Sequence, residues 1–203
     1  PVEAIEDAFR KVSRLEGATL DARNRVFHRL LVDGVTVEYR SDGAIHGAQA
    51  RLINFANSEN NDWIAVNQFT VVGLDERRPD VVVFVNGLPL GVVELKNSAN
   101  EQADVRAAFN QLQTYKQQIP ALFWCNALLI ASNGTDSRVG SLTANWERWV
   151  EWKRIEREDE PRRVSLDVML RGTCAPSRLL DLVENFTLFS EHKSGLTKII
   201  GQN

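Results

Sequence analysis

The sequence is poor in the features that mark several large classes of protein. It holds only two cysteines in 203 residues, Cys125 and Cys174, and their wide separation matches no metal or redox motif. We therefore expect buried free thiols and a reducing compartment, the cytoplasm. No apolar run is long enough to span a membrane, and neither a signal peptide nor a low-complexity tract is present.

Excess positive charge and phosphate-binding loops are also lacking. The net charge is −3, so a nucleic-acid substrate would have to be bound by a local basic face or by partners. No Gly-x-x-x-x-Gly-Lys-Ser/Thr stretch occurs, which excludes ATP hydrolysis by a P-loop within this chain. The composition, 43% hydrophobic and 25% charged, is that of one globular domain. Because the chain starts at Pro1 without a methionine, we expect a fragment of a longer polypeptide.

The most informative stretch is RPDVVVFVNGLPLGVVELK, residues 78–96. Two apolar runs, 81–85 and 88–95, flank Asn86-Gly87, and Asn-Gly between such runs is the strongest local signal for a β-hairpin. Apolar residues occupy both alternating sets of positions. This pattern predicts strands that are covered on both faces, in the centre of a sheet.

Charged residues stand at one end of this apolar hairpin. Asp80 precedes the first strand, and Glu94 and Lys96 lie two apart at the end of the second. Two neighbouring carboxylates suit Mg²⁺, and a lysine beside them can position or activate a water that attacks a phosphate. Pro79-Asp80 followed by Glu94-Leu95-Lys96 resembles the PD-(D/E)xK nuclease motif. A solvated strand end with an ion pair is the alternative interpretation.

The hairpin register conflicts with a shared metal. With a two-residue turn, Asp80 lies opposite Val93, so Glu94 points to the other face of the sheet. We therefore predict a β-bulge or a three-residue loop that sets Asp80 opposite Glu94. Gly91 is the first candidate for the irregularity and Pro89 the second.

The rest of the chain predicts an α/β fold with a central mixed sheet and helices on both sides. The ranges expected to be helical are 2–15, 21–32, 101–118, 166–170 and 177–186. The further ranges expected to be strands are 35–39, 48–55, 63–72 and 127–132. Three tryptophans in WERWVEW, residues 146–152, form either a packing face or a surface for stacking bases.

Longer motifs sharpen the interpretation. VNQFTVVG, RPDVVVFVNGLPLGVVELKN, AFNQLQTYKQQIP, LLIASNGTDSRVGSL and TANWERW follow in this order. Together they resemble the amino-terminal nuclease region of the restriction (R) subunit of type I restriction-modification enzymes. The resemblance covers about residues 25–152. It implies a restriction-endonuclease-like fold at residues 1–190 and a linker at 191–203 towards an ATP-driven motor outside this chain.

The resemblance also implies an activity and a set of site residues. The activity is Mg²⁺-dependent cleavage of double-stranded DNA, in a complex with modification and specificity subunits. Asp80 and Glu94 would hold the metal with the Leu95 carbonyl as a further ligand, and Lys96 would complete the catalytic set. The Gln-x-x-x-Tyr element of this family corresponds here to Gln111 and Tyr115, beside the site.

Two other functions stay open from the sequence alone. One is a catalytically silent DNA-binding or assembly module that keeps the motif for folding. The other is a stand-alone nuclease that selects DNA structures.

Overall fold

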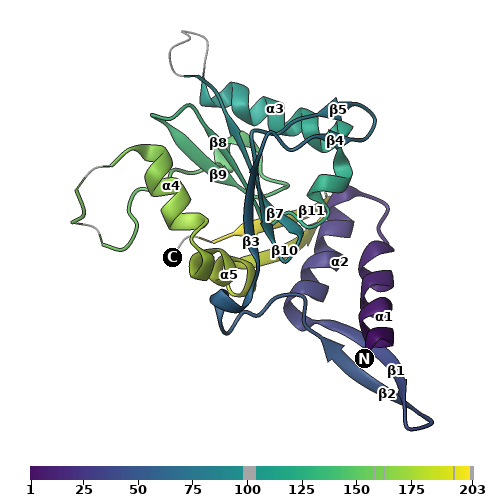
Figure 1. The fold of residues 1–203 in the computed structure, drawn as a ribbon. Helices are drawn as coiled ribbons and strands as arrows, with labels where there is room; N and C mark the ends of the chain where they lie inside the picture. Colours follow the sequence, from purple (N-terminus) through teal and green to yellow (C-terminus); the bar gives the residue numbers. More distant parts are fainter. Residues whose placement is uncertain (98–103, 158, 162, 194, 202–203) are drawn as a thin grey trace.

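The computed structural model describes residues 1–97, 104–157, 159–161, 163–193 and 195–201 (Figure 1). Its central element is a five-stranded sheet in which β7 and β8 run parallel and the other neighbours run antiparallel. The strands, in spatial order, are β3 (Trp63–Asn67), β6 (Val81–Val85), β7 (Leu88–Leu95), β8 (Leu128–Ser132) and β9 (Ser137–Gly140). The predicted mixed sheet is confirmed, with β7 in its centre.

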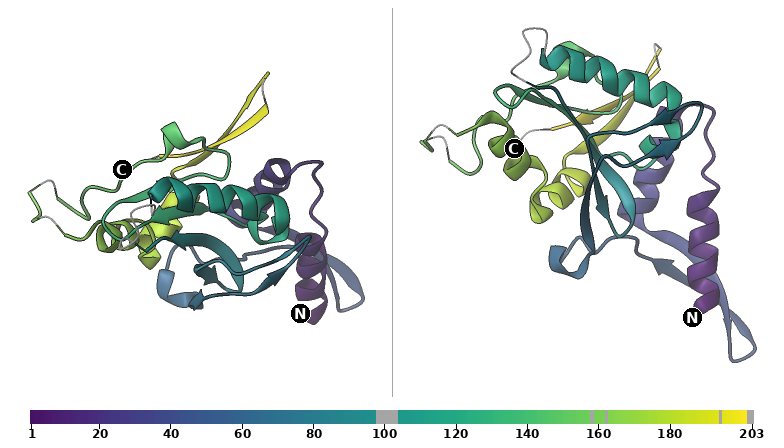
Figure 2. Two further views of the ribbon diagram at one scale, coloured as in Figure 1. Left: turned by 90° about the horizontal axis from the view of Figure 1, so that it is seen from above. Right: turned by 45° about the horizontal axis from the view of Figure 1, so that its top comes forward.

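Helices cover both faces of this sheet, as expected. One face packs against α3 (Val105–Gln118). The other packs against α2 (Leu20–Asp33), α4 (Ser165–Thr173) and α5 (Pro176–Glu184). Side chains alternate along a strand, so Val92 belongs to the α3 side and Val93 to the opposite side. Figure 2 shows α3 lying across the sheet.

The hairpin between β6 and β7 turns where the sequence predicts. Asn86 and Gly87 both have positive φ, 50° and 78°, as a tight two-residue turn requires. β7 is largely buried because both of its faces are covered, whereas β6 is in part only half-buried. Each apolar run of the sequence thus becomes an interior strand.

The predicted irregularity is present in β7. Phe84 pairs with Pro89, whereas Val83 pairs with Gly91, so Leu90 is the extra residue of a β-bulge. The bulge lies between the two candidates, and it shifts the register by one residue as predicted. Every side chain of β7 beyond it therefore changes face relative to a regular hairpin.

The amino-terminal part forms a separate layer. Helix α1 (Val2–Ser13) packs on the hairpin of β1 (Val35–Ser41) and β2 (Ala44–Ala50), which projects from the body of the molecule (Figure 1). Ala4 and Ala8 are buried on the face of α1 that packs against this hairpin. The larger apolar side chains of α1 are exposed instead, namely Val2, Ile5 and Phe9.

Two predicted strands are shorter than expected. The run 48–55 is extended only to Ala50, because the tight turn after β1 starts β2 earlier, at Ala44. The run 63–72 breaks at Gln68, whose φ of 51° is incompatible with a strand. The pair that follows the break comprises β4 (Val71–Val72) and β5 (Glu76–Arg77).

The predicted helices agree with the structure at most of their positions. The range 166–170 lies within the longer α4, and 177–186 corresponds to α5. The helix expected at 101–118 is observed from Val105, and its first residues, 101–103, lie outside the described residues. Three short 3₁₀ helices complete the described helical elements: Ser58–Asn60, Pro120–Phe123 and Trp146–Arg148.

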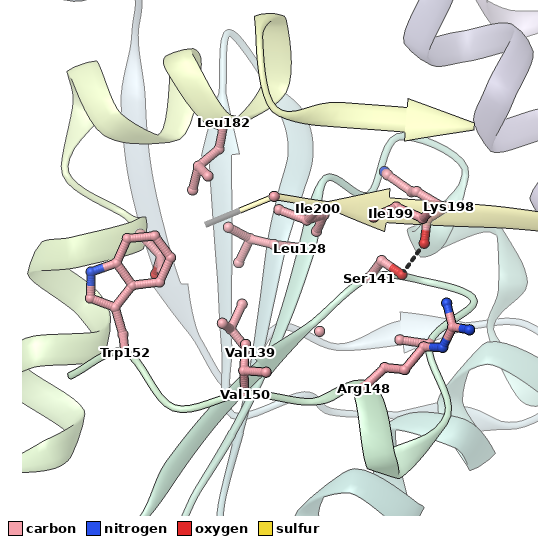
Figure 3. A pocket seen from close by; sticks show the side chains of 14 residues that line it. Leu128, Val139, Ser141, Arg148, Val150, Trp152, Leu182, Lys198, Ile199 and Ile200 are labelled. Carbon is pink, nitrogen blue, oxygen red and sulfur yellow. Dashed lines mark hydrogen bonds between the residues drawn. The ribbon is translucent and has the colours of Figure 1, made fainter. Parts of the chain in front are cut away.

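Another β-hairpin closes the described chain. Strands β10 (Thr187–His192) and β11 (Gly195–Ile200) pair antiparallel. The end of β10 and all of β11 fall in the range 191–203, which we expected to be a linker. Ser141 donates a hydrogen bond to the Lys198 carbonyl, and a mainly apolar cavity of about 70 Å³ lies beside this contact (Figure 3). Whether 191–203 also leads towards a motor region stays a prediction.

Cys125 and Cys174 are free thiols, as expected, but both are partly exposed rather than buried. In the part of the chain that the structure describes, no helix is long and apolar enough to cross a membrane.

Candidate active site

The start of β6 pairs with the end of β7, and the charged side chains there project from the face of the sheet that α3 covers. Val81 pairs with Val93, so the next position outward sets Asp80 opposite Glu94. The Asp80 Oδ2 atom accepts a hydrogen bond of 2.7 Å from the Leu95 backbone N–H. The bulge in β7 therefore produces the alignment of carboxylates that a regular hairpin would prevent.

Glu94 is the buried member of the pair, with 3% of its surface exposed. The Lys96 Nζ atom lies 2.7 Å from its Oε1 and partly offsets the cost of burying a charge. The Oε2 atom is buried without a hydrogen-bond partner among the described residues. Burial raises the pKa of Glu94, and the charge of Asp80 raises this pKa further against the opposing effect of Lys96.

Gln68 is a site residue that the sequence analysis missed. Its side-chain Nε2 donates to Asp80 Oδ1 at 2.8 Å, and its backbone N–H donates to the Asp80 carbonyl at 2.9 Å. The left-handed backbone of Gln68 turns the chain so that both contacts form. The polar pair Asn67-Gln68 inside an otherwise apolar run was the available signal.

Helix α3 contributes Gln111 and Tyr115, four residues apart and therefore on one face. Burial raises the pKa of the Tyr115 hydroxyl, and the nearby negative charges of Glu94 and Asp80 and a side-chain interaction with Glu94 raise it further. Gln111 lies close enough to interact with this hydroxyl and oppose part of the shift in its pKa. The hydroxyl is thus kept protonated beside the two carboxylates.

The structure brings all the predicted site residues into one region, from β6, β7 and α3. They are Asp80, Glu94, Leu95, Lys96, Gln111 and Tyr115.

The residues present fit a magnesium ion. Mg²⁺ is commonly held by one or two carboxylates while it keeps waters and binds substrate phosphates. Within the described ranges, no group of three or more His, Cys, Asp or Glu side chains could hold a metal. Asp80 and Glu94 form a two-carboxylate set, and Oε2 of Glu94, which has no hydrogen-bond partner among the described residues, is available as a ligand atom.

Fold and site together define the class of the protein. A mixed sheet with Asp80, Glu94 and Lys96 at the ends of two central strands is a restriction-endonuclease-like domain. The family described as "Type I restriction enzyme R protein N terminus" matches residues 1–148. The chain belongs to this family.

Individual relatives agree with this assignment. The type I restriction enzyme HindI endonuclease subunit of Haemophilus influenzae is 38% identical over 97% of this chain and 19% of its own length. The putative type I restriction enzyme MjaIXP endonuclease subunit of Methanocaldococcus jannaschii is 28% identical over 91% of this chain and 20% of its own length. The chain therefore spans about a fifth of the length of these relatives.

Proposed function

We propose that this chain is the Mg²⁺-dependent nuclease domain of a type I restriction enzyme R subunit, and that it hydrolyses phosphodiester bonds of double-stranded DNA. The observation that carries the proposal is the buried Oε2 of Glu94, which lies close to Asp80 and Lys96 and has no hydrogen-bond partner in the described part of the chain. An ionisable oxygen in such a place is costly to the fold, so a ligand-binding role accounts for it better than a structural one.

Each side chain has a defined part in this proposal. Asp80, Glu94 and the Leu95 carbonyl would hold Mg²⁺, which when bound supplies positive charge at the scissile phosphate. Lys96, kept in place by Glu94, positions or activates the attacking water. Gln68 orients the Asp80 carboxylate through its side-chain amide and holds the Asp80 backbone carbonyl through its own backbone N–H.

Gln111 and Tyr115 support the site from α3. The protonated Tyr115 hydroxyl can donate a hydrogen bond to a carboxylate or to a phosphate oxygen. Because it remains a neutral donor at physiological pH, we assign it to orientation rather than to metal binding.

The setting follows from the relatives, whose names describe endonuclease subunits of type I restriction enzymes. We propose that the complete subunit also contains an ATP-driven motor and works with modification and specificity subunits in the cytoplasm. The free thiols Cys125 and Cys174 are compatible with that reducing compartment.

One observation favours a catalytically silent module instead. Both oxygens of Asp80 already accept hydrogen bonds, from Gln68 and from Leu95, so this carboxylate has a structural role as well. A carboxylate oxygen has a second lone pair for a metal, and the two roles are compatible. They are separated by testing cleavage and folding in the same variants.

The test uses the complete restriction complex with circular DNA, ATP and a series of Mg²⁺ concentrations. Asp80→Ala, Glu94→Gln and Lys96→Ala should each abolish cleavage, while ATP hydrolysis persists because the motor lies elsewhere. Glu184→Gln, at an exposed carboxylate in α5, is the matched control and should cut normally.

Thermal melting of the same variants distinguishes the two functions. Loss of cleavage with an unchanged melting temperature supports the nuclease. Loss of cleavage together with collapse of the fold favours the silent module. Normal cleavage by all three site variants would refute the proposed function.

A further inference from the structure

Arg138 lies at the same level of the sheet as Glu94, the proposed metal ligand, two strands away from it. Glu94 pairs with Ala131 on β8, and Ala131 pairs with Arg138 on β9. Residues that face each other across neighbouring strands project from the same side of a sheet. Ala131 is fully buried in the core beneath α3, so Arg138 leaves the sheet on the side of Glu94 and Tyr115.

A second arginine meets Arg138 at a tryptophan. The guanidinium carbon of Arg138 lies 4.6 Å from the ring centroid of Trp146, and that of Arg106 lies 5.0 Å from it. Arg106 belongs to the first turn of α3, and Trp146 packs edge-on against Phe109 of the same helix. Cation–π contacts of this kind fix the planes of the guanidinium groups.

Neither arginine has a close ion pair among the described residues, although Asp104 accepts a hydrogen bond from the Arg106 backbone N–H at 3.1 Å. The ion pair of Arg138 with Asp136 is long, at 4.0 Å, and the Arg138 Nε is buried without a hydrogen-bond partner in the described part of the chain. No carboxylate of the described residues forms an ion pair with Arg106. Two like charges that contact the same ring repel each other, so an anion within reach of both would be stabilised.

We infer that Arg106 and Arg138, held by Trp146, bind a backbone phosphate of the DNA strand being cut. This inference rests on the proposed function and names a substrate contact of that same site. Guanidinium groups match phosphate oxygens in geometry as well as charge. The contact reads no base and therefore adds affinity without sequence preference.

The distances suit a phosphate near the scissile one. Arg138 is two strands from Glu94, which corresponds to about 10 Å between backbones. Arg106 precedes Tyr115 by roughly 13 Å along the helix axis. With a rise of about 3.4 Å per nucleotide, the bound phosphate lies within a few nucleotides of the cleavage point.

The test measures DNA binding directly, without cleavage. Fluorescence anisotropy of a labelled duplex is followed with this chain in EDTA over a series of salt concentrations. Arg106→Gln and Arg138→Gln should each weaken binding roughly fivefold at low salt. Each should also reduce the slope of log affinity against log salt by about 0.9, because one phosphate contact is lost.

Three further variants separate binding from structure. Arg178→Gln, in α5 on the opposite face, is the matched control and should bind as wild type. Arg138→Lys should keep the salt slope while losing part of the affinity, because lysine keeps the charge but not the planar fork. Trp146→Ala should weaken binding, and Trp146→Phe should restore part of it.

Unchanged binding by Arg106→Gln and Arg138→Gln, or equal weakening by Arg178→Gln, would overturn the inference. No detectable binding by the wild-type chain at low salt would overturn it as well. The proposed function is judged separately, by cleavage of circular DNA with Glu94→Gln. It can therefore stand when the phosphate contact fails, and it can fail when the chain still binds DNA.

Discussion

The buried ammonium of Lys198 makes stability depend on pH in a calculable way. Its Nζ donates to Asn24 Oδ1 at 3.0 Å and to the Asn126 carbonyl at 2.6 Å, where β11 meets the core. Lys198 is 2% exposed, and none of the ion pairs of the described residues includes it. Burial lowers the pKa of Lys198 from 10.5 to about 7.

The direction of the effect follows from proton linkage. Between pH 7 and pH 10.5 the unfolded chain holds a proton on Lys198 that the folded chain has largely lost. The free energy of unfolding therefore rises with pH through this window. Each unit of pKa difference is worth about 1.4 kcal/mol, and because the folded chain is already half deprotonated at pH 7, the gain between pH 7 and pH 9 is about 2.3 kcal/mol.

The assay compares urea unfolding of wild type, Lys198→Met and Lys193→Met at several pH values. Lys193 is exposed at the turn of the same hairpin and serves as the control. From pH 7 to pH 9, wild type should gain about 2 to 3 kcal/mol relative to Lys198→Met and nothing relative to Lys193→Met. The reasoning would be refuted if the free energies of unfolding of wild type and Lys198→Met, plotted against pH, stay parallel over this range.

Three other predictions concern the site and its support. Gln111→Ala and Tyr115→Phe should slow DNA cleavage less than loss of either carboxylate and leave Mg²⁺ affinity nearly unchanged; calorimetry showing lost metal binding would make them ligands. Deleting Leu90 should remove the bulge, separate the two carboxylates and abolish cleavage, even where circular dichroism shows a folded protein; retained cleavage would contradict the register argument. Gly140→Ala should lower stability by about 1 to 3 kcal/mol in urea unfolding, since the added methyl would lie 2.4 Å from the Trp149 ring; an unchanged midpoint would show that the indole relaxes.

Much of the β6–β7 hairpin with its candidate site could be predicted because its signals are local. Asn86-Gly87 specifies the turn, and the positions of Asp80 and Glu94 demand a change of register before the strand ends. The sequence did not predict which residue forms the bulge, because this depends on how side chains pack in the core. The Leu90 side chain is fully buried there.

The contacts that sequence reasoning missed join segments far apart in the chain. Gln68 reaches Asp80 only because its own backbone leaves the strand, and the apolar run around it masks that break. Arg138 lies on the same face of the sheet as Glu94 through the pairing of three strands, which no spacing in the sequence records. The burial of Lys198 likewise depends on Asn24 and on the β10–β11 hairpin.

The most direct test of the central claim is the position of the metal. Crystals of this chain with duplex DNA and Mn²⁺ in place of Mg²⁺ would locate the ion by its anomalous scattering. We predict a peak bonded, at about 2.1 to 2.2 Å, to one oxygen of Asp80 and to Oε2 of Glu94. Bound DNA with no peak between these carboxylates, or with Mn²⁺ bound only elsewhere, would contradict the account.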